Sequence, residues 1–119
     1  MASAPYPRER QSNLAKVLAV LRVEQESYTY IDKISQALSK DLALYYIREA
    51  LRDFHTLLSR GFENEGSRKL ASEIDFRALE EEIERIRRID GVAKLREELS
   101  AIVAQALSKS AHILYGAGA

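Results

Sequence analysis

The helix predicted over residues 41–60 carries arginines whose spacing suits contact with phosphate groups. Arg48 and Arg52 lie one helical turn apart, and Tyr45 precedes them on the same flank. Two like charges at i, i+4 destabilise an isolated helix by roughly 0.2–0.5 kcal/mol, so the pair calls for an explanation. Arginine donates bidentate hydrogen bonds to phosphate, and a tyrosine ring stacks on an unpaired base. We therefore interpret Arg48, Arg52 and Tyr45 as candidate nucleic-acid contacts. The alternative is a solvated flank whose charges are balanced by other charges of the same domain, for example by an ion pair between Glu49 and Arg52.

Two further groups of arginines are secondary candidates for nucleic-acid contact. They are Arg85, Arg87 and Arg88, at the end of another predicted helix, and Arg8 and Arg10, near the N-terminus. The first group follows a run of glutamates, an order that suits the helix dipole. Pairs at i, i+4 join Glu81 to Arg85 and Glu84 to Arg88, which favours a stable, exposed helix as the alternative interpretation.

The sequence shows no combination of residues typical of a catalytic or metal site. It has no cysteine, and His55 and His112 belong to no triad or metal-ligand spacing. A glycine-rich phosphate loop is also missing. We therefore expect no enzymatic activity, no metal or other cofactor, and no small-molecule substrate. The 18 basic and 18 acidic side chains cancel, which counts against a freely acting, non-specific nucleic-acid binder.

The elements that must position these residues are predicted to be helices throughout. Apolar residues recur at helical spacing, and no alternating apolar and polar run predicts a strand. A chain of 119 residues has the size of one domain. We expect an all-α fold, a single compact bundle of five to six helices with a long C-terminal helix, over residues 12–119. Residues 1–11 should form a flexible N-terminal arm. No apolar run is long enough to span a membrane, and we expect a cytoplasmic location.

Local signals predict where the helices begin and end. Ser12 is a plausible N-cap for a first helix that reaches about Val23, and Thr29 with Asp32 resembles a capping box. Asp41 should cap the third helix, and Gly61 should follow its end, with Phe62 folding back on the last turn. The remaining helices are expected from Ser67 to Glu73, from Asp75 to Gly91, and from about Val92 to Tyr115.

The centres of the apolar stripes predict the core. It should contain Leu18, Leu21, Ile34, Ile47, Leu51, Phe54, Leu79, Ile83, Leu99 and Ile102.

The last helix is apolar on more than one side from Ala101 to Tyr115. Such a helix is either central to the bundle or half covered by a neighbouring subunit, and both interpretations stay open. The candidates for an outward, protein-binding side are Val103, Leu107 and Leu114.

Three stretches of the chain carry a resemblance to a known family. They are Tyr28-Thr29-Tyr30-Ile31-Asp32-Lys33, Glu49-Ala50-Leu51-Arg52-Asp53 and the ending Leu114-Tyr115-Gly116. With the size and the helical profile, they make the chain resemble the small subunit of archaeal type I-A CRISPR interference complexes, in the compact form without an inserted β-domain. The resemblance covers most of the chain, but none of the stretches is a catalytic signature.

This resemblance implies an α-helical subunit along the belly of a Cascade-like ribonucleoprotein, beside the backbone subunits that hold the guide RNA. Such a subunit helps to hold target DNA during strand exchange. Its partners would be other subunits of the complex or copies of itself, together with a DNA strand that it binds weakly alone. The neutral net charge departs mildly from a nucleic-acid role and fits an affinity that comes mainly from assembly. The alternatives are a helical adaptor or a structural (viral or filament) protein without nucleic-acid contact, and a small subunit of another RNA-guided complex.

Overall fold

The computed structural model describes residues 11–25 and 29–116, and within these residues the chain consists of helices without any strand. This confirms the all-α prediction, including the long C-terminal helix. The predicted N-terminal arm lies outside the described residues, except for Gln11. The helices are α2 (Asn13–Gln25), α3 (Thr29–Gln36), α4 (Lys40–Arg60), α5 (Glu65–Ser72), α6 (Phe76–Arg87) and α7 (Val92–Tyr115).

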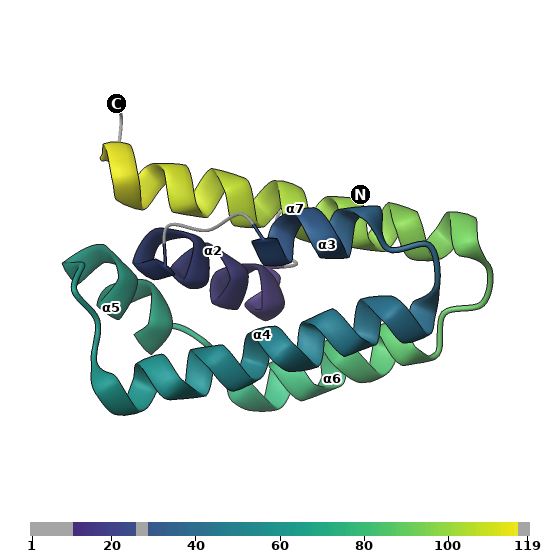
Figure 1. The fold of residues 1–119 in the computed structure, drawn as a ribbon, viewed down its shortest axis with the longest axis horizontal. Coiled ribbons are helices and arrows are strands. Elements are labelled where there is room, and N and C mark those ends of the chain that lie inside the picture. The colour runs from purple at the N-terminus through teal and green to yellow at the C-terminus, as the bar shows by residue number, and fades with distance from the viewer. Residues whose placement is uncertain (1–10, 26–28, 117–119) are drawn as a thin grey trace, which may run out of the picture.

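Helix α2 lies in the middle of the bundle, with α7 along one side and α4 and α6 along the other (Figure 1). All of its residues are buried except Lys16, Arg22, Glu24 and Gln25. Of the two positions that the sequence allows for the last helix, the central one is not seen: α7 is peripheral and packs one side along α2. The short α2 is thus the helix around which the others are arranged.

The predicted core is largely confirmed. Eight of its ten members are buried, while Leu51 and Ile83 are half-buried and pack against the others. Phe54 is fully buried, and its ring lies 6.4 Å from the rings of both Phe62 and Phe76. The predicted return of Phe62 onto the end of α4 is therefore seen as a contact between aromatic rings.

Several predicted helix boundaries were wrong by a few residues. The N-cap of α4 is Ser39, whose hydroxyl accepts the Leu42 N–H at 3.1 Å, and Asp41 belongs to the first turn. Helix α5 begins at Glu65, two residues before the predicted start at Ser67. Gly91 does not end α6, which stops at Arg87; with a φ of 94° it precedes the first residue of α7. Asp75 caps α6 as predicted, since its carboxylate accepts the N–H groups of Arg77 and Ala78.

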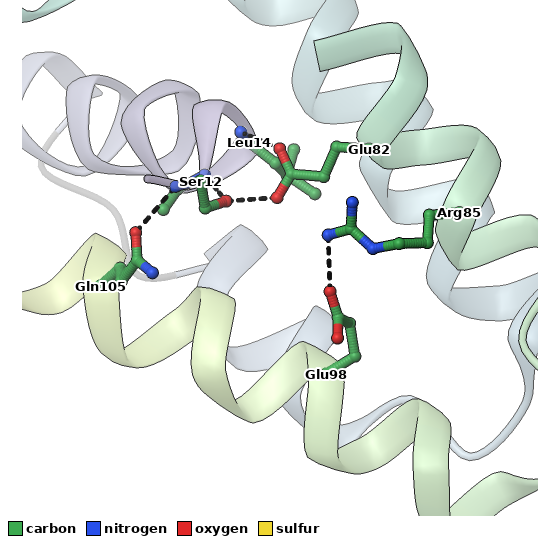
Figure 2. A network of polar contacts seen from close by, with 7 residues as sticks. Ser12, Leu14, Glu82, Arg85, Glu98 and Gln105 are labelled. Carbon is green, nitrogen blue, oxygen red and sulfur yellow. Dashed lines mark hydrogen bonds and ion pairs between the residues drawn. The ribbon is translucent and has the colours of Figure 1, made fainter. Parts of the chain in front are cut away.

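The beginning of α2 is held by side chains from distant parts of the chain (Figure 2). Glu82 of α6 is only 6% exposed, and its carboxylate accepts the Leu14 N–H at 3.0 Å and the Ser12 hydroxyl. The Ser12 hydroxyl oxygen in turn accepts the Ala15 N–H at 2.9 Å, which confirms Ser12 as the N-cap. Gln105 of α7 accepts the Ser12 N–H at 2.9 Å. Helices α6 and α7 therefore both satisfy the buried helix terminus.

Asn13 extends the same arrangement to the connection before α6. Its side-chain oxygen accepts the Asp75 N–H at 3.0 Å, so the first residue of α2 fixes the N-cap of α6. This hydrogen bond therefore joins the beginning of α2 to the beginning of α6.

We expect Glu82→Gln to lower the free energy of unfolding by roughly 1.5–3 kcal/mol, the range for hydrogen bonds to a buried charged group. An amide offers one acceptor oxygen in place of two and removes the negative charge from the beginning of α2. Urea denaturation measures the change. The matched control is Glu81→Gln, because Glu81 is an exposed neighbour on the same helix and should change stability by less than about 0.5 kcal/mol. Equal effects of the two substitutions would contradict the role given to Glu82.

Candidate nucleic-acid interface

The predicted basic flank of α4 is exposed along the helix. Tyr45 is 52% exposed, and Arg48 and Arg52 are also exposed. Arg52 forms an ion pair with Glu49, one turn earlier on the same helix, as the alternative interpretation allowed. Among the described residues, no acidic side chain lies within ion-pair distance of Arg48. The flank therefore presents one exposed arginine without an ion pair to a described residue, and a second whose surface ion pair contributes at most about 1 kcal/mol.

The tyrosines near this flank are divided between packing and exposure. Tyr45 and Tyr46 meet edge to face, with ring centroids 5.4 Å apart. Tyr46 is half-buried, and the Lys33 ammonium lies 5.3 Å from the centre of its ring. Tyr30 is also half-buried, and Tyr28 lies outside the described residues. Among Tyr30, Tyr45 and Tyr46, only Tyr45 therefore has an exposed ring that can stack on a base.

Tyr30 ties α3 to α4 through its hydroxyl, which donates a hydrogen bond to the Asp53 carboxylate. Burial, and then this bond to Asp53, raise the pKa of Tyr30 from 10.0 to about 12. The folded state therefore holds the phenolic proton more tightly than the unfolded chain does. This contribution to stability is complete below pH 10 and is lost as the pH rises through about 12.

We expect Tyr30→Phe to lower stability at neutral pH by about 1 kcal/mol, because the hydrogen bond to Asp53 is lost. The variant should also lose less stability than the wild type when the pH is raised from 10.0 to about 12. Denaturant unfolding at a series of alkaline pH values measures both effects. Tyr45→Phe is the matched control. Tyr45 is 52% exposed, so loss of its hydroxyl should change neither the stability at neutral pH nor the loss of stability at alkaline pH. The same alkaline loss in wild type and Tyr30→Phe would contradict this account.

The secondary arginines are partly engaged within the chain. Arg85 reaches across to Glu98 of α7, with a nitrogen–oxygen distance of 2.8 Å (Figure 2), and Arg87 pairs with Glu84 at 3.0 Å. The predicted i, i+4 pairs, Glu81 with Arg85 and Glu84 with Arg88, are not formed. Arg88 is exposed, and among the described residues it has no ion pair. Arg8 and Arg10 lie outside the described residues.

The predicted outward side of α7 needs one correction. Val103 is 9% exposed and belongs to the core, so it cannot contact a partner in this fold. Leu107 and Leu114 are 38% and 45% exposed, and they lie two turns apart on one side of α7. At 100° per residue, Val103, Leu107 and Leu114 fall within about 40° of one another around α7, so the spacing of apolar residues alone could not separate the buried Val103 from the two exposed leucines.

Two features of the structure were not predicted from the sequence. One is the burial of Glu82: the run of glutamates predicts an exposed acidic helix, but Glu82 alone of that run falls near the apolar stripe of Leu79 and Ile86. The other is a groove between α5 and α7, which holds Lys69 and Lys109 and has a volume of about 490 Å³. The signal for the groove was weak: Lys109 is an isolated charge in an otherwise apolar stretch of α7.

Other kinds of site find no support among the residues that the structure describes. No group of three or more histidine, aspartate and glutamate side chains could hold a metal ion in the described part of the chain. None of the described helices combines the length and the apolar character that crossing a membrane requires.

Comparison with known proteins places the chain in a family. A family model described as "CRISPR-associated protein (Cas_Csa5)" matches residues 17–111. The chain belongs to the Csa5 family of CRISPR-associated proteins. The matched range begins within α2 and ends near the end of α7, so it spans the helices whose arrangement is described above. The resemblance stated from the three sequence stretches is thereby confirmed.

One relative of this Csa5-family chain is a protein of Archaeoglobus fulgidus described as uncharacterized, with 50% identity over 107 residues. The alignment covers 89% of this chain and 92% of the relative, so the two proteins correspond over nearly their whole lengths. The archaeal source of the relative agrees with the archaeal family that the sequence resembles. No solved structure matches the chain.

Proposed function

We propose that this chain is a non-catalytic small subunit of a type I-A Cascade-like complex, where it assembles along the backbone and helps to hold target DNA during R-loop formation. The observation that carries the proposal is the exposed flank of α4 with Tyr45, Arg48 and Arg52, in a chain of the Csa5 family. Two arginines and one ring can contact a strand through phosphate and base without reading its sequence.

The charge balance supports a contact that works inside an assembly. With equal numbers of basic and acidic side chains, the chain lacks the general attraction to DNA that a free binder uses. Other subunits would bring the strand to the α4 flank, so that few contacts are sufficient. The same balance favours a second candidate, a helical adaptor with no nucleic-acid contact of its own.

The outer side of α7 supports the assembly part of the proposal. Leu107 and Leu114 are large, exposed apolar side chains, and the exposed Ala104 beside them permits close approach of another helix. Burying such a surface against a neighbouring subunit would release water from apolar groups. We place the contact with another subunit, or another copy of the chain, on this side.

Replacing Arg48 and Arg52 by alanine in the assembled complex should lower its affinity for target DNA. The slope of log affinity against log salt should fall by about 0.7 per lost phosphate contact on a single strand, or about 0.9 on duplex DNA, for each copy present. Fluorescence titration of the complex at several salt concentrations measures this. The matched control is Arg77→Ala with Arg96→Ala, which removes the same charge from exposed positions outside α4. An unchanged affinity and slope in the Arg48 and Arg52 variant would favour the adaptor.

Leu107→Glu should weaken incorporation of the chain into the complex while leaving the isolated chain folded. A charge on a partly exposed side chain is tolerated in water but is costly in an apolar interface. Co-purification with the other subunits measures incorporation, and thermal unfolding measures stability. Leu58→Glu is the control, because Leu58 is 41% exposed on α4, away from α7. Normal incorporation of the Leu107 variant would remove this side of α7 from the interface.

A further inference from the structure

The groove between α5 and α7 is a second basic feature, separate from the α4 flank. Its volume is about 490 Å³, within the range of about 300–1,000 Å³ typical of sites for small ligands. Leu70 and Ile113 supply its apolar lining. At Gly66 the two helices come so close that an added Cβ would lie 3.0 Å from Cγ2 of Ile113. Its lining residues are Gly66, Lys69, Leu70, Glu73, Ser108, Lys109, His112 and Ile113.

Positive charge dominates this groove. Lys69 and Lys109 line it together with Glu73, and the ammonium of Lys16 on α2 donates to the Glu73 carbonyl at 3.1 Å. The Lys109 ammonium donates to the Gln11 side-chain oxygen at 2.9 Å. Both observed acceptors are neutral, and no carboxylate of a described residue lies within ion-pair distance of either ammonium.

Lys109 is accordingly in a site that disfavours its charge. Burial, and then the neighbouring charge of Lys16, lower the pKa of Lys109, while the charge of Glu73 opposes them. A bound anion would offset both effects by supplying the countercharge that the groove lacks. The folded chain therefore presents a half-buried cation that gains from an anionic ligand.

The composition of the groove favours a nucleic-acid phosphate over a bare anion. Lysine binds phosphate as a point charge, and here two lysines stand beside an apolar lining and the His112 ring. A nucleotide offers both parts, a charged phosphate and a base whose flat face can stack on apolar and aromatic side chains. In Figure 1, α5 and the second half of α7 meet at the end of the bundle away from the beginning of α4. The groove is thus distinct from the flank that holds Arg48.

We propose that the α5–α7 groove binds a phosphodiester of a single nucleic-acid strand, with Lys69 and Lys109 on the phosphate and His112 and Ile113 beside the adjacent base or sugar. The proposal deepens the function above and rests on it, since the strand would be one held by the assembled complex. It gives the chain a second contact with nucleic acid, on α5 and α7 and separate from the α4 flank.

The test uses the isotope-labelled full chain in nuclear magnetic resonance titrations, which detect weak binding residue by residue. Adding a single-stranded oligothymidylate should shift the backbone amide signals of Gly66, Lys69, Lys109 and His112, with the shifts shrinking as salt is raised. In Lys69→Gln/Lys109→Gln these shifts should disappear, and the salt slope should fall by about 0.7 per lost phosphate contact. The control Lys94→Gln/Arg96→Gln removes the same charge from the exposed beginning of α7 and should keep the shifts.

The spectrum of each variant also reports whether the chain is folded, and Lys69→Gln alone provides the same test if the double variant is not. Shifts that are missing in wild type, or that persist in the folded lysine variants, would overturn the proposal. Inorganic phosphate and thymidine monophosphate are titrated in parallel. Equal groove affinity for either one and for the oligonucleotide would make the groove a site for free phosphate compounds and would overturn the assignment to a strand.

Failure of this proposal is distinguishable from failure of the proposed function. Amide shifts at Tyr45 to Arg52, and the affinity of the assembled complex with Arg48 and Arg52 replaced, report on the α4 flank independently. Amide shifts on the α4 flank without shifts in the groove would overturn the groove proposal and leave the proposed function standing.

Discussion

Backbone N–H groups at the beginning of a buried helix cannot be satisfied by bulk water, and in this chain the carboxylate of Glu82 accepts the bond that water would otherwise supply. The negative charge also lies at the end of α2 where the helix dipole favours it. Burying a carboxylate is costly unless it is hydrogen-bonded, so Glu82 and the beginning of α2 stabilise each other. Because Glu82 lies on α6 and Gln105 on α7, this one cluster places both helices around α2.

The central place of α2 determines which surfaces remain for partners. Nearly all of α2 is buried, so α4, α6 and α7 each turn one side to it and keep the other side exposed. Arg48 and Tyr45 occupy the exposed side of α4, and Leu107 and Leu114 that of α7. Nucleic-acid contact and subunit contact can therefore occupy different helices without competing. A charged substitution on the exposed side of one of these helices should therefore leave the contact made by the other helix unchanged.

The parts of this structure that sequence could predict are those that depend on local periodicity. The stripe through Ile47 and Phe54, the cap at Asp75 and the length of α7 all follow from spacing and from residue type. The burial of Val103 could not be predicted, because at helical spacing it falls on the same side of α7 as the exposed Leu107 and Leu114. Glu82 was missed for a related reason. Its neighbours Glu80, Glu81 and Glu84 are exposed, and although its position beside the apolar stripe hints at burial, its hydrogen bonds to the distant Ser12 and Leu14 appear only in the structure.

Contact between the α4 flank and a DNA strand is the claim on which the proposed function depends. Ultraviolet cross-linking of the assembled complex on target DNA, followed by mass spectrometry of the peptides, tests it most directly, because an exposed tyrosine ring stacked on a base forms an adduct where the two touch. The account predicts adducts on the α4 peptide that contains Tyr45, and fewer of them after Arg48→Ala/Arg52→Ala. A complex that contains this chain, binds target DNA and gives no adduct on α4 would contradict it.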